Sequence, residues 1–197
     1  MTDATIGRLL VAPLHQAITE VLPARVDFYE YWLTGEGLHG GTIGRAPMAA
    51  VLGFLRAERD HYAPVMSEAG RMAAEWAVDA MRAPYRRAVT ALPRSLRARA
   101  ALAFVKQVHR RGFSDARTLV KMRRGVARVE VRDSIFCQVR EAQAHPLCGY
   151  HAALITGVLA RFDLPADVVI EACHASGAPA CVLIVTLHGS APAANVS

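Results

Sequence analysis

Three cysteines and a glutamate in the last third of the chain are the residues whose types and spacing point most directly to chemistry. Within EACHASGAPAC (171–181), Glu171 and Cys173 lie two apart in a predicted strand and therefore share one of its faces. Cys181 opens the next predicted strand, so the intervening hairpin returns it toward Cys173. Cys148 stands at the start of a predicted helix, where the free N–H groups favour a thiolate.

Several interpretations of these groups stay open. Three sulfurs with one carboxylate or imidazole make a closed tetrahedral zinc site that would staple the helix to the hairpin. Glu171, His174, His145 and His151 are the candidates for a fourth ligand. The spacing matches none of the strong zinc-ribbon patterns, so the thiols can equally be buried and inert, or form a disulfide.

The other motifs do not predict catalysis. Gly35, Gly37 and Gly40 form a literal G-x-G-x-x-G, but Glu36 would repel a pyrophosphate and Pro47 delays the helix that a dinucleotide site requires. We therefore expect a loop or lid there. The chain has no G-x-S-x-G, H-E-x-x-H or Walker lysine.

Charge is distributed unevenly along the 197 residues. The segment from Arg82 to Arg124 holds 13 basic residues and one acid, whereas the remainder holds 10 bases and 16 acids. Such a segment is a solvated arginine-rich face, the rim of a pocket for an anionic ligand, or a nucleic-acid surface. It lacks interleaved aromatic residues, which argues against nucleic acid.

No stretch approaches the ~18 apolar residues of a membrane span. The N-terminus has an acidic start and no signal-peptide core, which predicts a cytoplasmic protein.

Helical periodicity dominates the first half of the chain. It predicts helices over 5–22, over 47–81 as two helices broken near 61–64, and over 95–110. The aromatic-rich segment 25–33 is ambiguous between strand and helix. Met and aromatic positions in these helices are ordinary core residues or the lining of a ligand cavity: Phe54, Tyr62, Met66, Met72 and Trp76.

The pattern changes near residue 115. Alternation over 126–132 predicts a strand that pairs with the preceding segment through a turn at Arg124–Gly125. A helix over 149–162 and two strands follow, and the last strand is apolar on both faces, as expected of a central strand. The fold class is α+β: a helical half (1–114) packed on a β-β-α-β-β unit with an antiparallel sheet (115–188), together one domain, and a disordered tail (189–197).

The C-terminal unit resembles a known family. The segments VRDSIFC, HPLCGYHAALITGVL and VIEACHASGAPACVLIV carry a Pro-x-Cys at a helix start and a Glu-x-Cys followed by a glycine and a second cysteine. They resemble the 4-vinyl-reductase domain family, a small-molecule-binding module that also forms the sensory region of phenol-responsive bacterial activators. The segment YRRAVTALPRSLRARAALAFVKQVHRRGF is similar to the bacteriochlorophyll-associated branch. At the position after the glycine this chain has Ala178, whereas the phenol sensors usually have an acidic residue there.

The resemblance implies a zinc site. In phenol-sensing members the corresponding cysteines and a nearby glutamate hold a structural zinc, which assigns the metal to Cys148, Cys173, Cys181 and Glu171. The offset of the glutamate from the next cysteine differs by one, which leaves the fourth ligand open. Cys137 falls outside the pattern and is expected in the core.

The resemblance also implies a function. It suggests a soluble protein that binds a hydrophobic tetrapyrrole, such as a porphyrin or chlorophyllide, as carrier or accessory in its biosynthesis. The helical Met and aromatic residues would line the pocket, basic residues would meet the ligand's acids, and a histidine such as His109 would reach a central metal.

Two alternatives remain. One is a vinyl reductase with an external hydride donor, since the sequence shows no nicotinamide or flavin site and so favours binding over catalysis. The other is a sensor of small aromatic compounds. The acidic remainder of the chain would suit a protein partner or a homodimer.

Overall fold

The computed structural model describes residues 5–33, 42–113 and 116–189. Its first half is mainly helical and contains, in chain order, β1 (Thr5–Gly7), α1 (Arg8–Val21), η1 (Pro23–Arg25), α2 (Val26–Leu33), β2 (Thr42–Gly44), α4 (Arg45–Ala57), α5 (Arg59–Asp79), α6 (Ala83–Thr90) and α7 (Arg94–Gly112). Its second half contains β3 (Arg117–Arg123), β4 (Val126–Arg132), η2 (Ile135–Cys137), α8 (Gly149–Ala160), β5 (Ala166–Ala172), η3 (His174–Ser176) and β6 (Cys181–Leu187). The predicted α+β class and the β-β-α-β-β order are confirmed.

The C-terminal half is built on an antiparallel sheet with the strand order β3-β4-β6-β5. The β3–β4 hairpin turns at Arg124 and Gly125, whose φ values of 50° and 80° match the turn type that suits the twist of paired strands. Ala127, Val129 and Val131 of β4 face the core, as their alternation predicts. The doubly apolar β6 lies inside the sheet, also as predicted.

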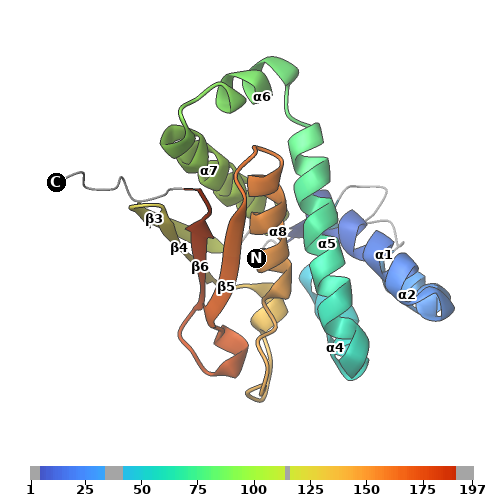
Figure 1. Cartoon of the computed structure of the whole chain (residues 1–197). Helices are drawn as coiled ribbons and strands as arrows, with labels where there is room; N and C mark the ends of the chain where they lie inside the picture. The colour runs from blue at the N-terminus through green and yellow to red at the C-terminus, as the bar shows by residue number, and fades with distance from the viewer. Residues whose placement is uncertain (1–4, 34–41, 114–115, 190–197) are drawn as a thin grey trace.

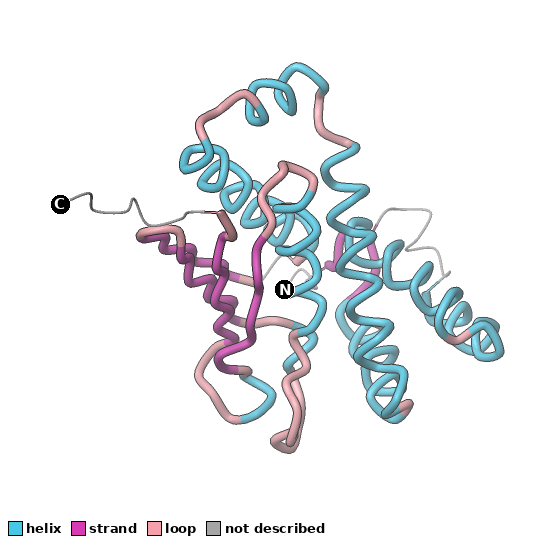
Figure 2. The backbone as a smooth tube through the Cα atoms, viewed as in Figure 1, coloured by secondary structure: helices cyan, strands magenta, loops and turns pink. Residues whose placement is uncertain are grey.

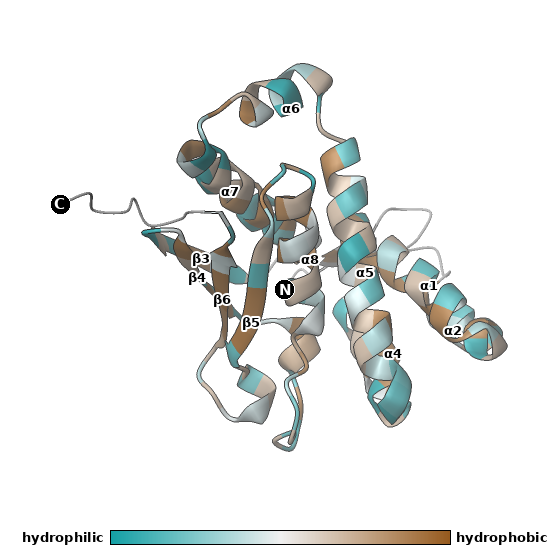
Figure 3. Cartoon of the chain, in the orientation of Figure 1, coloured by the Kyte–Doolittle hydropathy of each residue, from teal (hydrophilic) through white to brown (hydrophobic). Residues whose placement is uncertain are grey.

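The molecule is layered from the sheet toward the N-terminal helices (Figures 1 and 2). Helices α7 and α8 cover one face of the sheet, α5 packs against α8, and α1, α2 and α4 lie beyond α5. Figure 3 colours the chain by hydropathy, and the sequence of α8, GYHAALITGVLA, contains no Asp, Glu, Lys or Arg. This composition follows from its place between the sheet and α5, where two opposite faces are buried.

Helices α5 and α8 approach each other closely because glycine faces the contact from both sides. A Cβ at Gly70 would lie 2.4 Å from the carbonyl oxygen of Tyr150, and a Cβ at Gly157 would lie 2.7 Å from the Cβ of Ala74. Neither position accepts a larger residue without a shift of the helices. The contact fixes the helical half against the C-terminal half.

Three sequence-based expectations need correction or completion. The helix break in 47–81 lies at Glu58, not near 61–64, because the Glu58 carbonyl already accepts the N–H groups of His61 and Tyr62 and so starts α5 before Pro64. The ambiguous segment forms the helix α2. The short helix α6, rich in arginine, was not predicted.

Some expectations fall on other parts of the chain. The motif at Gly35, Gly37 and Gly40 and the tail over 190–197 lie outside the described residues. Among the helices that the structure describes, none combines the length and apolar character needed to cross a bilayer.

Candidate functional site

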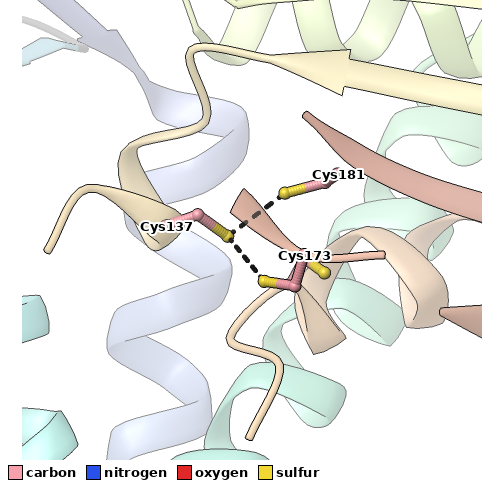
Figure 4. Close-up of side chains that lie close together, drawn as sticks. Cys137, Cys173 and Cys181 are labelled. Atoms are coloured by element: carbon pink, nitrogen blue, oxygen red, sulfur yellow. Dashed lines mark hydrogen bonds between the residues drawn. The ribbon is translucent and has the colours of Figure 1, made fainter. Parts of the chain in front are cut away.

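Four cysteine sulfurs converge in the C-terminal half. Cys137 ends η2, Cys148 precedes α8, Cys173 follows β5 and Cys181 opens β6, and all four side chains are buried. Their Sγ atoms all lie within 4.8 Å of one another. Figure 4 shows the sulfur of Cys137 directed at those of Cys173, 3.6 Å away, and Cys181, 3.3 Å away.

This spacing suits a single metal ion. Four sulfurs at about 2.3 Å from a tetrahedral zinc ion are about 3.8 Å apart. The four elements therefore already place the thiols near the vertices that such an ion requires. A closed set of four sulfurs leaves no open coordination position, which is typical of a structural site rather than a catalytic one.

Two of the sulfurs are polarised toward the thiolate form. The backbone N–H of Leu147 donates to Sγ of Cys173 at 3.4 Å, and the N–H of His174 donates to Sγ of Cys181 at 3.5 Å. Hydrogen bonds from the neighbouring thiols, first that of Cys137, hold the pKa of Cys173 well below its ordinary value. The thiolate is the form that binds a metal.

Glu171 does not join this group. Glu171 stays on the exposed face of β5, as the alternation of the strand requires, but Cys173 lies beyond the end of the strand and is buried, so the two do not share a face as predicted. The Glu171 carboxylate is half exposed on the sheet surface and pairs with Arg128 of β4. Cys137 takes the fourth place instead.

Cys137 is buried as expected, but as a member of the sulfur cluster. The sequence did signal it in one respect, since all four cysteines lie in the last third of the chain. Among the other candidates, His174 directs Nδ1 to the carbonyl of Ala178 at 2.8 Å and His145 is exposed.

A second buried polar cluster shares two of these segments, the one around η2 and the start of α8. The Oγ1 of Thr118 is 2.9 Å from Nδ1 of His109, whose Nε2 is 3.1 Å from Nδ1 of His151. The Nε2 of His151 is 2.8 Å from Oγ of Ser134. We call these four residues the histidine chain, because they form one unbroken line of hydrogen bonds with both imidazoles fully buried.

Aromatic rings enclose the two imidazoles. Phe113, Phe136 and Tyr150 each lie with their ring centroids 5.3–5.8 Å from that of His151. Burial lowers the pKa of His109 to about 4, and burial followed by the proximity of His109 lowers the pKa of His151 well below its ordinary value. Both rings are therefore neutral at pH 7.

The residues predicted to line a ligand pocket line none of the four pockets described below. Phe54 and Trp76 are each 39% exposed, Met66 is packed in the core, and Met72 is buried. The Tyr62 hydroxyl donates to the carbonyl of Leu147 at 3.1 Å and so ties α5 to the segment before Cys148. His109 belongs to the histidine chain. The role of these residues in ligand binding stays a prediction.

Four surface pockets are lined by other described residues. The largest of these four, about 640 Å³, lies where α5, α6 and α7 meet and is lined by Ala80, Met81, Arg82, Tyr85, Phe104, Gln107 and Arg111. A pocket of about 440 Å³ lies between α7 and β3, and one of about 320 Å³ lies beside Cys173. The fourth, about 450 Å³, lies between α6 and the end of α8 and is strongly basic.

Solved structures share this fold. A mutant H-NOX protein from K. algicida in the Fe(II) unliganded state has a TM-score of 0.61 at 12% identity, over 94% of this chain and 98% of that protein. An H-NOX protein from S. oneidensis in the Fe(II)NO state has a TM-score of 0.58 at 8% identity, over 93% and 100%. The phenol-responsive sensory domain of the transcription activator PoxR, with phenol, has a TM-score of 0.51 at 15% identity, over 74% and 75%.

At these identities the likeness shows the fold alone. The sequence matches no family model and no curated protein.

Proposed function

We propose that this chain binds a hydrophobic small molecule and that its four cysteine thiolates hold a structural zinc ion. The observation that carries the binding function is the fold, which the chain shares over nearly its whole length with H-NOX proteins and over three quarters with a domain that holds phenol. The sulfur cluster supports the metal. We place the protein in the cytoplasm, where four reduced thiols persist to bind a metal.

Zinc is the simplest occupant of the cluster. A tetrahedral set of four sulfurs favours zinc or iron. The ion would join η2, the start of α8, the end of β5 and β6, and would neutralise thiolates that otherwise repel one another inside the core. Its part is to hold the shape of the C-terminal half.

Elemental analysis of the purified protein tests the metal. We expect one zinc ion per chain and its loss in both Cys137→Ser and Cys173→Ser. The matched control is Glu171→Gln, which we expect to retain the full metal content. A protein without metal, or zinc retained in Cys137→Ser and lost in Glu171→Gln, would contradict the four-thiolate site; iron instead of zinc would identify a different ion on the same ligands.

For the ligand we propose a tetrapyrrole with acidic side arms, carried rather than chemically altered. The pocket between α5, α6 and α7 supports this choice because Arg82 and Arg111 would meet carboxylates while Tyr85 and Phe104 would lie against the ring. The likeness to Fe(II) H-NOX proteins and the resemblance to the bacteriochlorophyll-associated branch point in the same direction.

Absorbance titration with a free-base porphyrin tests the ligand. We expect a saturable Soret shift that weakens in Arg111→Gln and is unchanged in Arg99→Gln, which removes an exposed charge from the same helix outside the pocket. Equal affinities of the two variants, or no shift, would reject this pocket. Turnover of a vinyl porphyrin with NADPH alone would instead support the vinyl reductase of the sequence analysis.

A sensor of small aromatic compounds is the second candidate. Two observations favour it: the PoxR domain holds phenol, and an aromatic enclosure surrounds His109 and His151, whose hydrogen bond to each other a phenol hydroxyl would have to replace. Phenol would then raise the melting temperature of the protein, and His109→Phe would abolish that rise while preserving the porphyrin titration. A rise that persists in His109→Phe would place phenol elsewhere.

A further inference from the structure

The pocket between α7 and β3 has the make-up of a site for a small organic anion. Lys106, Arg110 and Arg117 bring three positive charges to a space of about 440 Å³, and none of the described residues that line it is acidic. Its remaining lining is Ala103, Gln107, Ala116, Thr118 and Leu119. Apolar side chains beside a few converging charges fit a carboxylate on an aromatic or aliphatic body better than a bare inorganic ion.

Thr118 belongs both to this pocket and to the histidine chain. It lines the pocket from β3, and its buried Oγ1 lies 2.9 Å from Nδ1 of His109. A ligand that reaches Thr118 therefore touches the first residue of a continuous hydrogen-bonded line. The line runs through His151 to Ser134, both of which are buried.

A chain of neutral imidazoles can run in only two directions. Each neutral ring has one donor nitrogen and one acceptor nitrogen. If Oγ1 of Thr118 accepts from Nδ1–H of His109, then Nε2 of His109 must accept from Nδ1–H of His151, and Nε2 of His151 must accept from the hydroxyl of Ser134. If the Thr118 hydroxyl donates to His109, every one of these bonds is reversed.

We propose that the α7–β3 pocket binds a small organic carboxylate, which takes the hydrogen bond of the Thr118 hydroxyl and thereby sets the direction of the whole histidine chain. An anion accepts and cannot donate, so the bound state has the proton of both rings on Nδ1. This site lies apart from the pocket between α5, α6 and α7 and goes beyond the function proposed above.

The Ser134 end of the histidine chain adjoins the sulfur cluster. The carbonyl of Ser134 accepts the N–H of Cys137 at 3.0 Å, and the carbonyl of Cys148 accepts the N–H of His151 at 3.0 Å. The direction of the chain decides whether the Ser134 hydroxyl donates to His151 or accepts from it. A ligand at the surface is thus connected to the two segments that carry Cys137 and Cys148.

Benzoate is a suitable probe for binding to the full chain, measured by calorimetry. We expect saturable binding that weakens about threefold to fivefold in Lys106→Gln. The matched control is Lys121→Gln, which removes the other lysine of the chain from an exposed position on β3 outside the pocket and should leave the affinity unchanged. Equal affinity for benzoate in both variants, or equal binding of inorganic phosphate, would overturn the site.

The hydroxyl is tested by two substitutions of one residue. Thr118→Val keeps the shape and removes the hydroxyl, and we expect a loss of affinity of about tenfold or more, since a hydrogen bond to a charged group is lost. Thr118→Ser restores the hydroxyl and should restore binding. If the valine variant binds benzoate as well as the serine variant, the hydroxyl takes no part.

The direction of the hydrogen bonds in the histidine chain follows from which imidazole nitrogens carry the protons. In protein labelled with ¹⁵N-histidine, benzoate should move His109 and His151 fully to the Nδ1–H form, whereas benzamide, whose amide group also donates, should not. Phenol bound against the imidazoles would act independently of Lys106. Dependence on Lys106 therefore distinguishes benzoate in the α7–β3 pocket from phenol bound by the aromatic sensor proposed above. Benzoate binding without any change at His151 would overturn the coupling.

Discussion

The sulfur cluster and the histidine chain are two buried polar clusters that share two segments. Ser134 and Cys137 stand three residues apart around η2, and Cys148 and His151 stand three residues apart at the start of α8, so each segment contributes one residue to each cluster. Their electrostatics nevertheless differ. Neutral imidazoles and hydroxyls satisfy one another, because each offers both a donor and an acceptor. Thiols are poor hydrogen-bond donors, and four thiolates repel one another. The sulfur cluster therefore needs a cation.

This difference predicts that removal of the metal has the largest effect on stability. A structural zinc site contributes much of the folding free energy of the region that it joins. We expect a strong chelator, or Cys137→Ser, to lower the melting temperature by roughly 10 °C or more, measured by calorimetry. If the melting temperature of the wild-type protein were unchanged after complete removal of the metal, the thiols would be inert core residues.

The second-largest effect that we expect is a loss of protein stability at low pH, caused by the histidine chain. Because the folded protein holds the pKa of His109 at about 4, below its unfolded value near 6.5, the unfolded state binds a proton first as the pH falls. Stability attributable to His109 is therefore complete above pH 6.5 and falls by about 2 kcal/mol between pH 7 and pH 5. Denaturant unfolding at the two pH values measures it.

The attribution to buried histidine has a control. His61→Gln removes an exposed imidazole from α5 and should preserve the pH dependence, whereas His109→Gln should reduce it. If the unfolding free energy fell equally with pH in the wild type and in His109→Gln, other groups would be the cause of the acid sensitivity.

Ser134→Ala should have an intermediate effect. It leaves Nε2 of the fully buried His151 without its partner, at a cost of about 1–3 kcal/mol in unfolding free energy. The metal content should remain at one ion per chain, because no sulfur is moved. Loss of the metal in this variant would show that the two clusters form one unit.

Glu171→Gln should have the smallest effect. The carboxylate and Arg128 form a half-exposed pair on the sheet, and such pairs contribute at most about 1 kcal/mol. We expect a change in unfolding free energy within about 0.5 kcal/mol. A loss of stability comparable to that of Cys137→Ser would show that Glu171 belongs to the sulfur cluster, contrary to its exposed position on the sheet.

The two clusters also differ in how far the sequence predicted them. Cys148, Cys173 and Cys181 stood out because each lies at the end of an element whose type was readable from its periodicity. The histidine chain was not predicted beyond the separate mention of His109 and His151. Its residues lie up to 42 positions apart, and nothing in their local sequence distinguishes them from other histidines and hydroxyls.

The sequence by itself determined the types of most elements, the β3–β4 turn, the central place of β6 and the concentration of thiols in one half of the chain. These features follow from local rules, since periodicity, turn residues and apolar runs act within a few residues. The tertiary structure alone decided that Cys137 completes the sulfur cluster, that Glu171 leaves it, and that His109 meets His151. Alternation applies only within a strand and so does not place Cys173, which follows the end of β5, and contacts between distant elements depend on how the helices and the sheet pack together.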